Sequence, residues 1–258
     1  MHTRSEGLKA TNYLELLMNR RTFLAGGVAT GTSLALAGCL DRVTGLIDDS
    51  PTVLDEPDMY DEMRQSRDDG YLGFPIHNDE LPAVTLPDAL SDREVTTTEF
   101  VGEKHSLMTF IFTRCPEACP VVVSNLARVQ LDAVEEGYDD EMAFMPVTFD
   151  PEYDTPDVLE EFSEANGADP GADNWHFLRP EDEQRADEVV NGTFGADYEY
   201  HSEEEREQEG MPDDMAYSHL YLILLTNKDG YVERGYNGSR LPNASGLVQD
   251  VREVVEGW

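Results

Sequence analysis

Basic residues are scarce in this chain. It has 18 lysines and arginines against 54 aspartates and glutamates, a net charge of −36. Nucleic-acid binding is excluded, because too few cations are present to neutralise phosphates. The acidic residues are spread along the whole chain, which argues against a single anionic binding patch. Such self-repulsion destabilises a compact state at low salt and is screened in molar salt, where the Debye length is ~3 Å. The composition resembles that of proteins from extreme halophiles.

Long apolar runs are also lacking. The longest soft apolar segment, 24–37, is too short to span a membrane. It follows the pair Arg20-Arg21 and ends in Leu-Ala-Gly-Cys (36–39), which resembles a lipoprotein box. These features predict a twin-arginine export signal over 1–38, cleavage before Cys39 and a lipid on its sulfur. A buried helix with an incidental cysteine is the alternative. We therefore expect a chain anchored to the cell membrane on its extracellular side.

The rest of the chain is long enough for one domain and has no internal repeat. Residues 39–80 are rich in Asp, Pro and Gly and predict an acidic flexible tether. Residues 81–258 predict a single α/β domain. Without the signal, the chain keeps 14 basic and 52 acidic residues, a net charge of −38.

Hydrophobic patterning predicts the order of helices and strands in that domain. Alternating β and α units, then a hairpin and a helix, indicate a mostly parallel central sheet with one antiparallel strand and helices on both faces. Segment 81–101 adds a small N-terminal hairpin. The expected strands are 106–113, 142–149, 175–178, 219–226 and 231–235, and the expected helices are 120–136, 156–166, 182–191 and 245–256.

Cysteine is scarce as well, with three in the chain, and only Cys115 and Cys119 lie beyond the predicted lipid site. They follow the apolar run 107–112, where a strand ends and a helix begins. Open α/β sheets place their chemistry at this carboxyl edge. A helix N-terminus also lowers a thiol pKa, which favours the thiolate that binds metal or attacks disulfides. A structural disulfide is the alternative, although so short a loop removes little chain entropy.

A histidine could join the two thiols, and their expected positions separate five of the six candidates. His105 and His176 open strands that run toward the cysteine edge, so both lie at the far end of the sheet. His2 belongs to the signal and His77 to the tether. His219 opens a strand that runs the other way, so its start lies at the cysteine edge.

Three motifs, taken in order, resemble those of the SCO/SenC family. They are Thr-Arg-Cys-Pro-Glu-Ala-Cys-Pro (113–120), Thr-Phe-Asp-Pro-Glu-Tyr-Asp-Thr-Pro (148–156) and Ser-His-Leu-Tyr-Leu-Ile-Leu (218–224). The resemblance covers about residues 80–257. It implies a thioredoxin-like fold and one copper ion held by Cys115, Cys119 and His219. It also implies a partner, the copper-receiving subunit of a terminal oxidase.

The ligand types agree with copper independently. Two thiolates and one imidazole suit Cu(I) and can also hold Cu(II), whereas zinc usually recruits a fourth ligand. Asp150 and Asp154 match the family's acidic motif and are candidates to orient the site or to dock a partner. For Asp154, a plain turn carboxylate before the helix is an equal alternative.

Two departures from the family stand out. Members commonly carry an acidic residue just before the Ser or His of the third motif, where this chain has Tyr217. The acidic loop 196–216 before it contains Met211, Met215 and His201. These side chains could offer additional ligands to incoming copper, or they could be ordinary loop residues.

The leading interpretation is therefore a metallochaperone that delivers copper, or a reducing equivalent, to a nascent oxidase. A thiol–disulfide oxidoreductase using Cys115 and Cys119 is one alternative. The spacing of the pair opposes it, since three residues intervene where thioredoxins have two, and no proline precedes strand 219–226. A copper buffer without a client is the third possibility.

Overall fold

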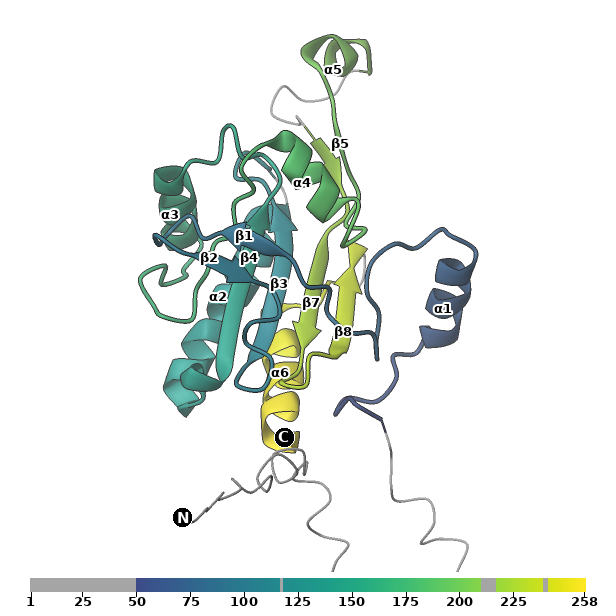
Figure 1. Ribbon diagram of the computed structural model, residues 1–258, viewed down its shortest axis with the longest axis vertical. Helices are drawn as coiled ribbons and strands as arrows, with labels where there is room; N and C mark the ends of the chain where they lie inside the picture. The colour runs from purple at the N-terminus through teal and green to yellow at the C-terminus, as the bar shows by residue number, and fades with distance from the viewer. Residues whose placement is uncertain (1–49, 117, 210–216, 239–240) are drawn as a thin grey trace, which may run out of the picture. The chain divides into compact units, whose positions relative to one another are not determined.

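A four-stranded sheet in the order β4-β3-β7-β8 forms the centre of the molecule (Figure 1). The computed structural model describes residues 50–116, 118–209, 217–238 and 241–258. β3 and β4 run parallel, β7 runs antiparallel to β3, and β8 runs antiparallel to β7. Three strands therefore point one way and β7 the other, as predicted. The bounds are β3 His105–Ile111, β4 Met142–Thr148, β7 Leu222–Thr226 and β8 Val232–Asn237.

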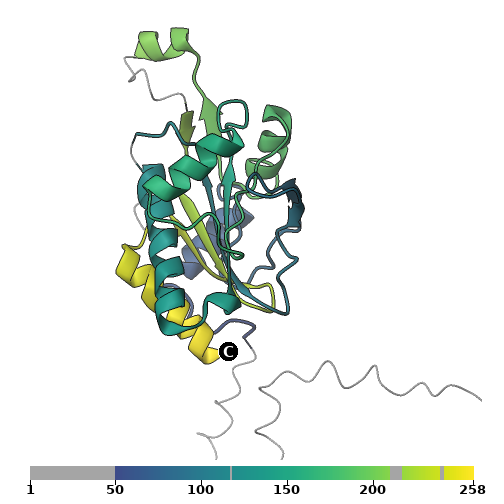
Figure 2. The same cartoon turned by 90° about the vertical axis from the view of Figure 1, so that its left-hand side faces the viewer.

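The sheet is covered on both faces, which explains why all seven residues of β3 and all seven of β4 are buried. Figure 2 shows α2 and α6 together on one face, and α4 with the β1–β2 hairpin on the other. The predicted N-terminal hairpin is confirmed, because β1 and β2 pair antiparallel. These elements are α2 Ala118–Glu136, α4 Glu183–Val190, α6 Ala244–Gly257, β1 Thr85–Pro87 and β2 Glu94–Thr96.

Local sequence determines the ends of several helices. α3 (Pro156–Ala165) has Thr155 at its N-cap and proline at its first position, as predicted. Gly167, just past its end, has a φ of 87°, which glycine adopts without strain. The side chain of Asn243 caps α6 by accepting a hydrogen bond from the Gly246 N–H at 2.9 Å.

The predicted strand 219–226 is two strands. β6 (Tyr217–His219) leaves the central sheet and pairs with β5 (Tyr198–Tyr200), while β7 stays in it. The break falls at Leu220, whose N–H donates to the carbonyl of Asp197 instead of continuing the ladder. The loop expected over 196–216 contains β5 and the helix α5 (Glu203–Glu209). The strand predicted over 175–178 is not formed: this segment makes isolated bridges to β4 and to Asp88. The short helical turn η3 (Asp139–Glu141) leads into β4.

The prediction of a flexible tether over 39–80 is wrong for residues 50–80. The compact unit begins near residue 50, not at 81. Its first 30 described residues include the helix α1 (Tyr60–Asp68) and place Ile76 at 0 % exposure and Leu54 and Phe74 at 4 %. The apolar residues of this segment are few and are separated by Asp, Pro and Gly, so its composition resembles that of a linker.

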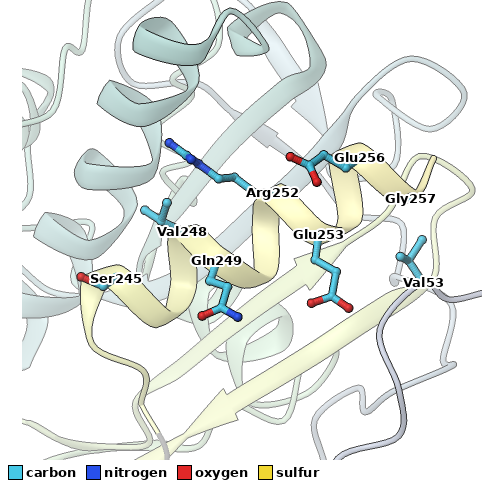
Figure 3. A pocket seen from close by; sticks show the side chains of 8 residues that line it. All are labelled: Val53, Ser245, Val248, Gln249, Arg252, Glu253, Glu256 and Gly257. Carbon is cyan, nitrogen blue, oxygen red and sulfur yellow. The ribbon is translucent and has the colours of Figure 1, made fainter.

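A buried carboxylate holds the first described residues in place. Glu233 of β8 accepts hydrogen bonds from the backbone N–H groups of Val53 and Leu54, each at 2.9 Å. The side chain of Asn227, which follows β7, donates to the carbonyl of Pro51 at 2.8 Å. Figure 3 shows Val53 beside the carboxyl end of α6. The chain thus enters the domain at the edge where β3 begins, opposite the edge where β3 ends.

Residues 1–49, which include the predicted signal and Cys39, lie outside the described part of the chain. Among the helices that are described, none has both the length and the apolar character that crossing a bilayer requires.

Candidate metal centre

Two sulfurs and one imidazole meet at the carboxyl edge of β3. The His219 Nε2 atom lies 3.5 Å from the Cys119 Sγ and 3.8 Å from the Cys115 Sγ. The three ligand atoms all lie within 4.8 Å of one another. Cys119 is fully buried, Cys115 is buried, and His219 is partly exposed. The structure therefore brings together the three residues that the sequence singled out.

The junction of β3 and α2 places the two thiols. After β3 ends, the N–H of Cys115 donates to the carbonyl of Phe112 at 3.3 Å, which turns the chain back toward the sheet. α2 begins at Ala118, within two residues of the expected start, with Pro120 in its first turn, where a missing N–H costs no hydrogen bond. Cys119 consequently lies inside the helix and points into the core.

Burial raises the pKa of the Cys119 thiol well above its usual value, and a hydrogen bond with Cys115 adds to this. The expectation that the helix N-terminus would lower this pKa is therefore wrong for Cys119, because loss of hydration outweighs the helix dipole. In the metal-free protein this thiol carries its proton at neutral pH. A thiophilic metal has to displace that proton, so binding releases protons.

Aromatic rings surround the imidazole of His219. The ring centroid of Tyr221 lies at 4.5 Å, that of Phe149 at 5.2 Å and that of Phe112 at 5.5 Å. The Nδ1 atom is buried and has no hydrogen-bond partner among the described residues. Within the described part of the chain no carboxylate orients the ring directly, and aromatic packing holds it with Nε2 toward the sulfurs.

Asp154 lies beneath the cysteine loop. It is fully buried and accepts hydrogen bonds from the Thr113 N–H at 3.2 Å, from the Thr113 hydroxyl and from the Thr148 hydroxyl. Burial raises its pKa to about 6, and the threonine hydrogen bonds oppose this. The carboxylate does not cap α3, so it binds the loop before the cysteines instead of the helix it precedes.

Asp150 contacts the same loop and also β6. Its Oδ2 accepts from the Arg114 guanidinium at 2.5 Å, and its Oδ1 accepts from the Tyr217 hydroxyl at 3.3 Å. Sequence reasoning missed both partners. The partner Arg114 could have been found from the sequence, because an arginine directly before Cys115 is conspicuous in a chain with so few cations.

The other candidate ligands lie elsewhere. His105 and His176 are buried away from the cysteine edge: His105 pairs with Met142 at the start of β4, and His176 lies 3.3 Å from Asp88. His201 bonds the Ser218 hydroxyl at 2.5 Å and is not part of the thiol cluster. Met211 and Met215 lie outside the described residues.

A cavity of about 220 Å³ opens onto the site. Phe112, Cys115, Tyr217 and His219 are among the residues that line it. A larger hollow of about 850 Å³ runs along α6 (Figure 3), but its lining contains no thiol and no imidazole. The smaller cavity therefore marks the site, because Cys115 and His219 line it.

The fold and the thiol–imidazole cluster define a thioredoxin-like protein with a candidate metal centre, and the comparisons with known proteins are specific. Residues 88–256 match the SCO1/SenC family. The chain belongs to that family. No curated protein sequence matches it.

Solved structures of Sco proteins have the same fold. A SCO1/SenC family lipoprotein from Bacillus anthracis is 22% identical, with a TM-score of 0.54 over 69% of this chain and 96% of the other. ScoI from Bradyrhizobium japonicum with copper bound is 20% identical, with a TM-score of 0.53 over 68% and 99%. BsSco, described as a cytochrome c oxidase assembly protein with a disulfide switch, is 23% identical, with a TM-score of 0.52 over 71% and 97%.

Proposed function

We propose that this protein binds one copper ion through Cys115, Cys119 and His219 and supplies it to the copper centre of a terminal oxidase. The observation that carries the proposal is the convergence of three soft or borderline ligand atoms within 4.8 Å. Membership of the SCO1/SenC family supports it. So do two similar solved structures, ScoI with copper bound and BsSco, a member of a family of cytochrome c oxidase assembly proteins.

The donor set fits copper as a cargo. Two thiolates and one imidazole satisfy three-coordinate Cu(I) and also hold Cu(II). Among the described residues the cluster has no fourth His, Cys, Asp or Glu, which zinc would normally recruit. The cavity beside Cys115 and His219 gives an incoming or departing ligand access to the metal. These are the properties of a site that takes up copper and passes it on.

We infer the place of action from the predicted export signal. A twin arginine, a short apolar segment and Leu-Ala-Gly-Cys (36–39) support transport across the cell membrane and a lipid on Cys39. The lipid would keep the domain at the outer surface of the membrane, where the copper-accepting part of an oxidase subunit would be met.

Copper titration of the reduced full-length chain tests the proposal. A Cys39→Ser background leaves only Cys115 and Cys119 as thiols, so each added variant reports on the site. We expect one copper per chain in molar salt, and almost none after Cys115→Ser or Cys119→Ser. Full copper affinity in either serine variant would contradict the proposal.

A thiol–disulfide reductase acting on an oxidase subunit is the second candidate. The hydrogen bond between the two thiols favours it, since the sulfurs are close enough to react. Burial of Cys119 opposes it, because the raised pKa of this thiol leaves little of the attacking thiolate. Rapid disulfide reduction by a protein that binds no copper would establish this candidate instead.

A further inference from the structure

Tyr217 stands where the family commonly has an acidic residue, two positions before His219. Its side chain is 5 % exposed, and its hydroxyl donates to the Asp150 Oδ1 at 3.3 Å. Asp150 is 3 % exposed, so this hydrogen bond is shielded from water. β6 has no carboxylate of its own at this position. Asp150, in the loop after β4, provides one, and the Tyr217 hydroxyl binds it.

The same carboxylate binds the cysteine loop. Arg114, the residue before Cys115, donates to the Asp150 Oδ2 from Nη2 at 2.5 Å and from Nε at 3.2 Å. The Arg114 guanidinium also lies over the ring of Tyr153, 4.4 Å from its centroid. Asp150 thus joins the segment that carries Cys115 to the strand that carries His219.

The ring of Tyr217 transmits this restraint to the imidazole. It packs against Phe112 at 5.0 Å and Phe149 at 5.5 Å between centroids. Both phenylalanines in turn contact the His219 ring, at 5.5 Å and 5.2 Å. Because Nδ1 of His219 has no partner among the described residues, these two rings and that of Tyr221, at 4.5 Å between centroids, support the imidazole from its sides.

We propose that Tyr217 is a positioning residue: its bond to Asp150 fixes β6 against the cysteine loop and holds the His219 imidazole over the two sulfurs. The inference rests on the proposed copper function and adds how the third ligand is kept in place. Tyr217 is not one of the three proposed ligands, and its hydroxyl bonds Asp150. It acts through the rings it packs against and through the carboxylate it shares with Arg114.

The chain offers a matched control in Tyr198. Its ring stacks on Phe149 at 4.5 Å between centroids and contacts Tyr217 at 5.9 Å. Its hydroxyl has no hydrogen bond among the described residues. Tyr217→Phe removes only a hydroxyl bonded to a buried carboxylate, whereas Tyr198→Phe removes an unbonded hydroxyl from the same aromatic cluster.

The test is copper titration of both variants in the full-length Cys39→Ser chain, with the Cu(II)–thiolate absorption recorded at saturation. We expect Tyr217→Phe to weaken binding by about ten-fold, as loss of a hydrogen bond to a charged acceptor does. We also expect its absorption band to shift, because the imidazole is less constrained. Tyr198→Phe should change neither. Thermal unfolding of the metal-free variants separates a local effect from general destabilisation.

A double-mutant cycle completes the test. In an Asp150→Ala background, Tyr217→Phe should have no further effect on affinity or absorption. If the wild type binds one copper but Tyr217→Phe matches Tyr198→Phe in both readouts, the positioning role is wrong and the proposed function stands. If the wild type binds no copper, the proposed function itself fails. A full ten-fold effect of Tyr217→Phe without Asp150 would also overturn the inference.

Discussion

Asp154 accepts a hydrogen bond from the backbone N–H of Thr113 at 3.2 Å and so ties the loop after β4 to the loop after β3. Asp150 does the same one residue later, through Arg114. The two acids of one motif thus bind the two residues that precede Cys115. Asp150 and Asp154 are four positions apart, so Asp154 reaches Thr113 while Asp150 reaches Arg114.

Burial of Asp154 should appear in the pH dependence of stability. Its folded-state pKa of about 6 exceeds the usual 3.8, so its contribution is complete below pH 4 and is lost as pH rises through 6. Asp154→Asn removes this contribution. The free energy of unfolding of the wild type, relative to the variant, should fall by about 3 kcal/mol between pH 4 and 7. Denaturant unfolding in molar salt measures it, and parallel pH curves for the two proteins would disprove it.

His219→Ala should separate metal binding from thiol chemistry. Removal of one of three ligands opens the metal to water, so most copper affinity should be lost and any Cu(II)–thiolate absorption should shift. The Cys115–Cys119 pair should still form a disulfide, which needs only two sulfurs within reach of each other and no imidazole. His201→Ala is the control, since His201 bonds Ser218 outside the cluster. Unchanged affinity in His219→Ala would remove this histidine from the ligand set.

The proposed anchor is tested with Cys39→Ser. On this proposal a lipid on Cys39 supplies the membrane attachment, so the variant should be released into the medium or remain as an unprocessed precursor. Membrane fractionation and the mass of the mature N-terminus measure the result. Normal membrane retention of the variant, or a mature N-terminus at another residue, would refute the predicted lipidation.

His105 should make the protein sensitive to acid. Burial, with a smaller effect of Lys228, lowers its pKa to about 3, and neither ring nitrogen has a hydrogen-bond partner among the described residues. The folded chain keeps it neutral, whereas the unfolded chain takes up a proton below pH 6.5. Its contribution is therefore present above pH 6.5 and is lost as pH falls toward 3.

His105→Phe removes this proton uptake. Between pH 7 and pH 5 the wild type should lose about 2 kcal/mol of unfolding free energy relative to the variant. Chemical unfolding at the two pH values measures the difference. Equal pH dependence in the two proteins would mean that His105 takes up its proton between pH 7 and 5 in the folded chain as it does in the unfolded chain, and would contradict the prediction.

The net charge of −36 predicts a strong dependence on salt. Screening shortens the Debye length from ~10 Å at about 0.1 M to ~3 Å at about 1 M, so repulsion between surface carboxylates fades. The midpoint of thermal unfolding should rise by tens of degrees over this range. An uncharged osmolyte serves as control, and a midpoint indifferent to potassium chloride would contradict the prediction.

The sequence predicted the elements whose signals are local. The buried strands β3 and β4 are continuous apolar runs, and α3 carries its own start and stop residues in Pro156 and Gly167. Reasoning from strand direction placed His219 at the cysteine edge, and the structure puts it there. The prediction of copper as the metal, and of these three residues as its ligands, came from the resemblance to the SCO/SenC family.

Features made by long-range contacts could not be predicted. The packing of residues 50–80 depends on Glu233, about 180 positions away from Val53. The bond between Tyr217 and Asp150 spans 67 positions, and no local pattern announces it. The raised pKa of Cys119 likewise follows from burial, which the core around it creates, and not from its place in a helix.

The chain enters the domain through Pro51 and Val53 at the edge where β3 begins, and Cys115 lies beyond the other end of that strand. A strand of seven residues separates these edges by ~20 Å. Eleven residues between a lipid on Cys39 and residue 50 reach at most ~40 Å. A lipid on Cys39 would therefore attach the domain from the edge opposite its thiols, so the attachment itself would leave the metal centre open to a partner.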